Sequence, residues 1–85
     1  MNEDALHILL ADDDEDDRLF FTDAIDEIKV RTIVHTVNDG VQLMERLQDP
    51  DSKLPNLIFL DLNMSIKGGM ECLKEIRSDK NLKDI

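Results

Sequence analysis

Three aspartates stand at the carboxyl ends of two apolar segments of this chain. Asp12 and Asp13 follow the apolar residues 8–11, and Asp61 follows the apolar residues 57–60. If both segments are neighbouring strands of a parallel sheet, the carboxylates meet in one crevice at the sheet edge, where such sheets place their ligands. Two unit charges about 4 Å apart cost about 4 kcal/mol at an effective dielectric of about 20. The trio therefore needs a proton or a divalent cation, and we predict a metal ion beside Asp61.

The apolar residues alternate between strand and helix patterns along the chain. Continuous or β-branched apolar runs predict strands at residues 6–11, 32–37 and 57–60. Apolar residues at helical spacing predict three helices whose buried stripes are Phe21, Ala24, Ile25 and Ile28; Val41, Met44 and Leu47; and Met70, Leu73 and Ile76. The first helix is expected to run from about residue 16 to residue 28. This alternation predicts an α/β domain with a parallel sheet and right-handed crossovers.

Composition limits the functions open to the chain. Its 85 residues form one domain at most, and the formal net charge of −10 argues against nucleic-acid contact, because a phosphate backbone requires a basic patch. Neither a signal peptide nor a run of about 20 apolar residues is visible, so we expect a cytoplasmic chain without membrane contact. The single cysteine, Cys72, excludes an internal disulfide and is expected to be a small buried hydrophobe.

The motifs at these positions resemble those of the receiver domain of two-component response regulators. The first apolar strand ends in the family's acidic pair, and residues 57–64 resemble its phosphoacceptor strand and loop. Gly69 falls eight residues after Asp61, where that loop usually has glycine, and residues 38–40 resemble the turn after the second strand. The resemblance implies a flavodoxin-like, doubly wound parallel sheet with strand order 2-1-3.

The resemblance covers nearly all of residues 6–77, which correspond to the first three strand–helix units of a fold that normally has five. We therefore assign residues 1–85 to one receiver domain that lacks the last two units. The family's serine or threonine on the fourth strand, its lysine on the fifth and its aromatic switch residue have no counterpart here. Ser65 is a further departure from the family pattern, because the family usually has proline at this position. Proline would make the loop more rigid, so Ser65 leaves it less rigid.

The resemblance also implies the role of each residue in the acidic pocket. Asp61 is expected to accept a phosphoryl group from a histidine kinase or a phosphotransfer protein, and Mg²⁺ is expected to neutralise the added charge. The expected metal ligands are the carboxylates of Asp13 and Asp61 and the main-chain carbonyl of Asn63, with Asp12 holding a ligated water. The chain is then a signalling switch and not an enzyme, apart from self-phosphorylation and self-dephosphorylation of a complete domain at Asp61.

Two other functions stay open. A magnesium-dependent phosphohydrolase of the haloacid dehalogenase type also uses an aspartate nucleophile, but it has a second aspartate two residues later, where this chain has Asn63. A truncated receiver without phosphotransfer is the other alternative, because residues 57–60 are too apolar for a solvent-facing edge strand. In that case we expect a self-associating interaction module, most simply a symmetric homodimer.

The remaining polar residues near the pocket are expected to have structural roles. Residues 14–17 are expected to be solvated or to cap the first helix. A calcium-binding loop is excluded, because Asp17 stands where such a loop needs glycine. His7 is expected at the end of a strand, and Lys67 is expected to face solvent although its loop follows Asp61.

Overall fold

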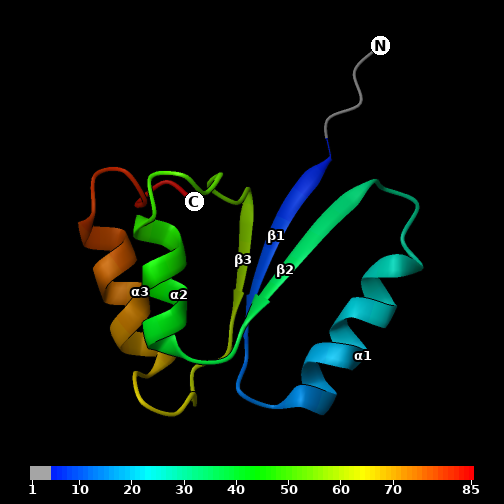
Figure 1. Ribbon diagram of the computed structural model, residues 1–85, viewed down its shortest axis with the longest axis horizontal. Helices are drawn as coiled ribbons and strands as arrows, with labels where there is room; N and C mark the ends of the chain where they lie inside the picture. The colour runs from blue at the N-terminus through cyan, green and yellow to red at the C-terminus, as the bar shows by residue number, and fades with distance from the viewer. Residues whose placement is uncertain (1–4) are drawn as a thin grey trace.

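The fold is a parallel sheet of three strands with three helices, in a computed structural model that describes residues 5–85. The strands are β1 (Leu6–Ala11), β2 (Thr32–Val37) and β3 (Leu57–Leu60). The helices are α1 (Glu15–Asp26), α2 (Gly40–Gln48) and α3 (Gly69–Ser78). Strands and helices alternate along the chain (Figure 1), as the sequence predicts. No helix in this described range is both long and apolar enough to cross a membrane.

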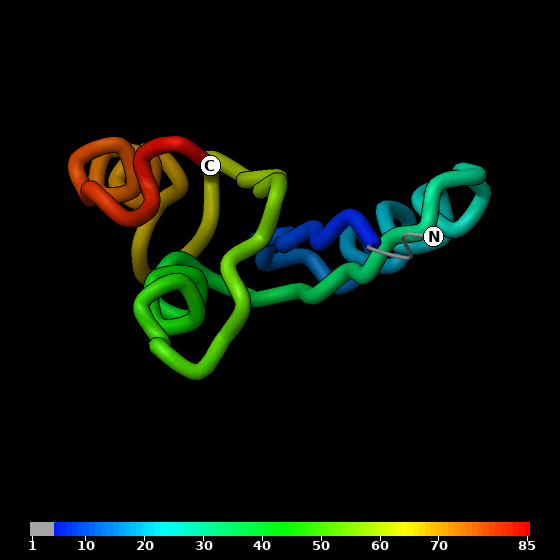
Figure 2. The backbone as a smooth tube through the Cα atoms, turned by 90° about the horizontal axis from the view of Figure 1, so that it is seen from above, coloured from blue at the N-terminus to red at the C-terminus, as the bar shows by residue number. Residues whose placement is uncertain are grey.

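β1 lies between the other two strands and pairs in parallel with both. In the register of the sheet, Leu10 of β1 lies opposite Thr36 of β2 and Phe59 of β3. The observed order β2-β1-β3 confirms the predicted order 2-1-3 of a flavodoxin-like sheet. The first crossover runs from β1 out to β2, and the second runs back past β1 to β3. Because the two run in opposite directions, α1 lies on one face of the sheet and α2 and α3 lie on the other (Figure 1, Figure 2).

The larger core lies between the sheet and the pair of helices α2 and α3. Alternate residues of a strand share a face, so Leu9 and Ala11 of β1 both point into this core, and Ile58 and Leu60 of β3 pack against it. The other buried members come from the end of β2, from α2, from the loop after β3, and from α3 and the residues that follow it: Val37, Leu43, Met44, Leu47, Met64, Cys72, Ile76 and Leu82. Each large apolar side chain that is fully buried here contributes about 1.5–3 kcal/mol.

Cys72 lies fully buried in this core, where α3 packs against α2. Its Sγ contacts the main-chain carbonyl of Gly40 at 3.6 Å, and burial raises the pKa of the thiol. The prediction of a small buried hydrophobe is confirmed. The close packing also explains the glycine, because a Cβ at position 40 would stand 2.7 Å from the Cys72 sulfur and 2.3 Å from the carbonyl oxygen of Lys67.

The face beneath α1 is covered less completely. Ile8 and Leu10 of β1 are buried, and the ring of Phe21 from α1 meets the ring of Phe59 from β3 edge to face, with centroids 4.7 Å apart. Leu57 and Phe59 nevertheless remain 40% and 41% exposed. Within residues 5–85, no strand pairs with the outer edge of β3. The apolar residues of β3 are therefore only partly covered by the described part of the chain.

Some residues of the predicted helical stripes are exposed instead of buried: Ala24, Ile28, Val41 and Met70. α1 ends before Ile28, and the faces of α2 and α3 are rotated from the predicted ones. In both of these helices the buried stripe begins at the first residue, Gly40 or Gly69. The next residue lies about 100° further round the helix, so Val41 and Met70 point away from the core.

Candidate functional site

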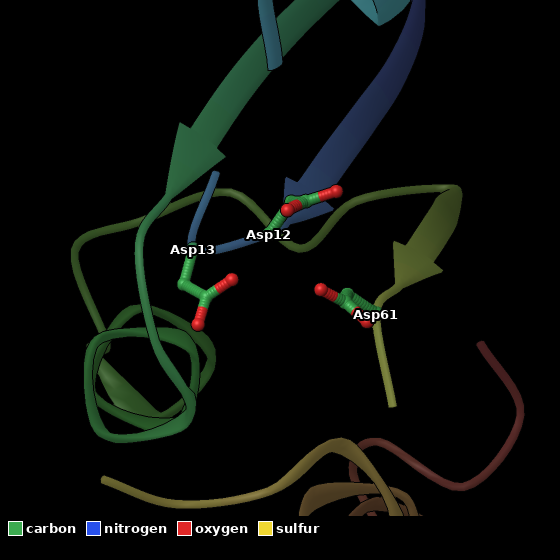
Figure 3. A group of neighbouring side chains, drawn as sticks. All are labelled: Asp12, Asp13 and Asp61. Atoms are coloured by element: carbon green, nitrogen blue, oxygen red, sulfur yellow. The ribbon is translucent and has the colours of Figure 1, made fainter. Parts of the chain in front are cut away.

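The three aspartates lie together at the carboxyl ends of β1 and β3. Asp12, Asp13 and Asp61 each offer one carboxylate oxygen that lies within 4.8 Å of the corresponding oxygens of the other two. Asp13 and Asp61 reach toward the same space from the loop after β1 and from the end of β3, with Asp12 beside them (Figure 3). Asp12 and Asp61 are partly buried, and Asp13 is exposed. The parallel topology thus brings the carboxylates into one crevice, as the sequence analysis expects.

The hydrogen bonds of the sheet continue into the site and fix two of these residues. The main-chain N–H of Asp12 donates to the carbonyl of Val37 at 3.2 Å, and the N–H of Asp61 donates to the carbonyl of Ala11 at 2.9 Å. Both aspartates therefore extend the parallel ladder by one residue beyond the strands. Their position depends on the sheet and not on the loops that follow.

Each of the three carboxylates also accepts one hydrogen bond from a main-chain N–H. Asp12 Oδ1 accepts from Asp14 at 2.9 Å, and Asp61 Oδ1 accepts from Asn63 at 2.9 Å. Asp13 Oδ2 accepts from Ser65 at 3.1 Å, across 52 residues of sequence. The second oxygen of each carboxylate accepts no hydrogen bond from residues 5–85, so one oxygen of each group is available to a ligand.

The first turn of α1 adds negative charge to the crevice. Asp14 caps the helix, because its Oδ1 accepts from the N–H groups of Asp16 at 2.8 Å and Asp17 at 3.3 Å. The pKa of the Asp17 carboxyl is raised above its ordinary range, first by the charge of Asp14 and then by burial and by the charges of Asp12 and Asp61. Asp14 and Asp17 therefore add negative charge beside the three carboxylates, and the guanidinium of Arg18, which donates to the Asp12 carbonyl at 2.9 Å, adds one positive charge.

A cavity of about 300 Å³ opens beside the carboxylates on the α1 face of the sheet. Its walls combine three acidic residues with apolar ones: Asp12, Asp17, Asp61, Leu10, Phe21, Phe59 and Leu60. The sequence pattern predicts only a solvated or capping role for Asp17, whereas in the structure Asp17 lines this cavity. The available signal was helical spacing, because Asp17 lies one turn before Phe21, which faces the sheet.

Lys67 lies outside the acidic crevice. Its ammonium group pairs with the carboxylate of Glu75 on α3, and this partner raises the pKa of Lys67. The side chain of Lys67 is only 21% exposed, so the expectation that it faces solvent is wrong. The ion pair accounts for the difference, because it draws the side chain down onto the helix.

His7 and Asn63 have different relations to the site. His7 lies near the amino end of β1, at the opposite end of the strand from the aspartates, and its N–H donates to Asn56 Oδ1 at 2.8 Å. Asn63 follows Asp61 closely, and its N–H is bound to that carboxylate. The role of the Asn63 carbonyl as a metal ligand stays a prediction.

The donor set suits a hard divalent cation. All three groups that meet in the crevice are carboxylates, and no histidine or cysteine of the described residues joins them. Mg²⁺ and Mn²⁺ prefer oxygen ligands of this kind, whereas zinc and copper sites are usually built with nitrogen or sulfur. Three carboxylates this close also repel one another unless a cation or a proton compensates them. The residues present therefore fit a magnesium or manganese ion.

Comparison with known proteins gives a consistent result. The profile of the response regulator receiver domain matches residues 8–85. The response regulator Rcp1 of Synechocystis sp. is 38% identical over an alignment of 85 positions that covers 92% of this chain and 56% of that protein. The solved structure of the Mn²⁺-bound form of Rcp1 is similar with a TM-score of 0.89 and 34% identity, over 93% of this chain and 60% of that one. The phosphorylated cyanobacterial phytochrome response regulator RcpA is similar with a TM-score of 0.86 and 36% identity, over 94% and 60%.

Proposed function

The chain belongs to the response regulator receiver domain family of two-component signalling, and from this premise we propose that it is a phosphoacceptor switch with Asp61 as the acceptor. The main support is the position of Asp61, which ends β3 in a crevice with two further carboxylates within 4.8 Å. A similar solved structure is of a phosphorylated regulator and another is of a Mn²⁺-bound one. The chain spans 56% to 60% of these relatives, so phosphotransfer by these 85 residues is itself part of the proposal.

Asp61 is the nucleophile in this proposal. Its Oδ1 accepts the N–H of Asn63 and keeps a second lone pair for the cation, so we assign to Oδ2 the attack on phosphorus. As the new oxygen–phosphorus bond forms, the bond between phosphorus and the nitrogen of the donor histidine breaks, and that nitrogen keeps the electron pair. The hydrogen bond from Asp61 N–H to the carbonyl of Ala11 holds the nucleophile at the end of the sheet during the transfer.

The neighbouring carboxylates hold the cation in this proposal. Asp13 and Asp61 are its carboxylate ligands, the Asn63 carbonyl is a third ligand, and Asp12 orients a ligated water. A bound Mg²⁺ supplies the charge neutralisation that lets a carboxylate approach a phosphoryl group. The donor is a histidine kinase or a phosphotransfer protein, and receiver domains in general are signalling domains and not enzymes.

Labelling with a small-molecule phosphodonor tests the acceptor. Asp61→Asn keeps the shape of the side chain and removes the nucleophile, so incorporation of phosphate with Mg²⁺ present should be lost. Asp51→Asn is the matched control, because it makes the same charge change in the exposed loop before β3 and should label normally. Undiminished labelling of the Asp61→Asn protein would exclude Asp61 as the acceptor. An acyl phosphate is hydrolysed in base, whereas a phosphohistidine is stable there. A base-stable label would therefore place the phosphoryl group on His7 or His35.

We also propose that the 85-residue chain self-associates through the outer edge of β3. Leu57 is exposed there, and a cavity of about 180 Å³ runs between β3 and α3, lined by Leu57, Ile58, Leu60, Leu73, Ile76, Arg77 and Ile85. Unpaired strand edges with apolar side chains favour pairing with a second copy. Light scattering at micromolar concentration should give twice the chain mass of 9.8 kDa. A well-folded species of one chain mass would refute this association.

A further inference from the structure

The loop between β3 and α3 contacts the acidic crevice through one main-chain group. The N–H of Ser65 donates to Asp13 Oδ2 at 3.1 Å. Asp13 is exposed, and this is its one hydrogen bond to the described residues, so the contact fixes the rotation of the carboxylate. The donor exists only because position 65 is not proline, which has no N–H. The departure from the family pattern at Ser65 thus creates the bond.

The loop reaches this geometry through an unusual turn. Ile66 has a φ of 67°, in the left-handed region that β-branched residues rarely enter. The N–H of Lys67 donates to the carbonyl of Ser65 at 2.7 Å, which closes a three-residue γ-turn of the strained, positive-φ form around Ile66. The Ile66 side chain is 80% exposed, so its own packing does not hold the turn. Contacts on either side must do so.

Those contacts lie immediately before and after the turn. Met64 is buried in the core, and the Lys67 ammonium pairs with Glu75 on α3. The Lys67 carbonyl lies so close to Gly40 of α2 that a Cβ there would stand 2.3 Å from the oxygen. With both flanks fixed against the helices, the Ser65 N–H is directed at the crevice. The loop therefore presents a preorganised donor to the Asp13 carboxylate.

We propose that Ser65 is a positioning residue whose main-chain N–H holds Asp13 by Oδ2 and so directs Oδ1 toward the divalent cation. The inference rests on the proposed function, since it assumes that Asp13 is a ligand. Groups that orient metal ligands from outside the coordination sphere commonly change metal affinity by about 10- to 100-fold. The side-chain hydroxyl of Ser65 has no part in this role.

Two substitutions at the same position test the proposal. Ser65→Pro removes the N–H, and we expect the dissociation constant for Mn²⁺, measured from the electron paramagnetic resonance signal of the free ion, to rise about 10- to 100-fold. Ser65→Ala removes the hydroxyl and keeps the N–H, so its dissociation constant should equal that of the wild-type chain. Equal affinity of the Ser65→Pro protein and the wild-type chain would overturn the proposal, and so would a matching loss in the Ser65→Ala protein.

Amide hydrogen exchange keeps the proposal testable if the Ser65→Pro protein does not fold. The Ser65 amide should be protected in the wild-type chain, remain protected at saturating Mg²⁺, and lose protection in the Asp13→Ala protein. Absence of protection, or its loss when Mg²⁺ binds, would overturn the positioning role. If the wild-type chain binds no Mn²⁺, the cation of the proposed function fails. If it binds Mn²⁺ and Ser65→Pro has no effect, the inference about Ser65 fails alone.

Discussion

Gly69 lies directly against the main chain of Asp61. A Cβ on Gly69 would stand 2.3 Å from the carbonyl oxygen of Asp61 and 2.6 Å from the Cα of Leu62. The Gly69 N–H also donates to the Leu62 carbonyl at 3.3 Å. The first residue of α3 is therefore packed against the main chain that directly follows β3, at Asp61. The glycine is required by this approach and not by its backbone angles, since no glycine in the described range has a positive φ.

This contact predicts different effects for two adjacent glycines. Gly69→Ala forces the main chain of α3 away from Asp61 and should reduce the free energy of unfolding by about 1–3 kcal/mol, as overpacking does. The control is Gly68→Ala, because a Cβ there meets only the Leu62 carbonyl oxygen at 3.8 Å, an ordinary contact. Urea denaturation of both proteins measures the difference. Equal stability of the two would show that α3 shifts away from Asp61 without cost.

The γ-turn at Ile66 predicts a stabilising substitution. A β-branched residue held at positive φ stores about 1–3 kcal/mol, whereas glycine adopts this conformation freely. Against this gain, glycine gives the unfolded chain more conformational entropy, which lowers the free energy of unfolding by about 0.5–1 kcal/mol. The net effect of Ile66→Gly should be a rise in the free energy of unfolding of about 1 kcal/mol. For a chain of this size that corresponds to a rise of about 4–8 °C in Tm. Ile66→Val keeps the branched side chain and should leave Tm unchanged.

The raised pKa of Asp17 predicts how stability depends on pH. A carboxyl whose pKa is higher in the folded than in the unfolded state destabilises the fold when it is ionised. This cost is absent below the unfolded-state pKa, grows as the pH rises through both pKa values, and is fully present above the folded-state pKa. Asp17→Asn should therefore raise the free energy of unfolding at pH 7, because it removes repulsion from Asp14 and then from Asp12 and Asp61.

The gain from Asp17→Asn should shrink as the pH falls and disappear in acid, where the wild-type carboxyl is protonated. Urea denaturation between pH 3 and pH 7 measures it. Asp23→Asn, an equal charge change at an exposed position of the same helix, is the control. A gain for Asp17→Asn that is the same at both ends of this pH range would contradict the electrostatic explanation.

The acidic crevice predicts a stability that depends on divalent cations. A cation that binds only the folded state should raise the free energy of unfolding by about 2.7 kcal/mol when its free concentration is about 100 times its dissociation constant. Asp13→Asn should remove this response to Mg²⁺ or Mn²⁺, and Asp51→Asn should keep it. Thermal unfolding with and without metal measures both. If the wild-type chain is folded and its Tm is the same with and without the metal, the result would argue against the metal site.

The sequence was sufficient to predict the sheet and insufficient to predict the helix faces. The strands at residues 6–11, 32–37 and 57–60 were found at their observed bounds, because buried parallel strands are continuous apolar or β-branched runs between turn residues. The predicted buried faces of α2 and α3 differ from the observed ones by a rotation about the helix axis, because the observed buried stripes begin at Gly40 and Gly69. A glycine is not counted as apolar in such patterns, so the stripe was assigned to neighbouring side chains.

Within the site, too, some features can be predicted from the sequence and others cannot. The meeting of Asp12, Asp13 and Asp61 follows from strand order alone, since neighbouring parallel strands end at the same edge. The bond from Ser65 to Asp13 depends on one loop conformation, with a positive φ at Ile66 that isoleucine does not favour. Local preference at that residue predicts a different backbone, and only the packing on either side of the turn overrides it. Sequence patterns do not encode such packing.

The long chain separation between β1 and β3 predicts a late assembly of the crevice during folding. The bond from His7 to Asn56 closes a segment of 49 residues, and the bond from Ser65 to Asp13 closes one of 52. Closures of this length cost more entropy than the shorter one that joins β1 to β2, so we predict that the acidic edge is completed after the first crossover has formed. Interactions that are absent from the folding transition state change the unfolding rate and leave the refolding rate almost unaffected. We therefore predict that a cation bound by these aspartates slows unfolding, and so lengthens the lifetime of the native chain, without speeding its formation.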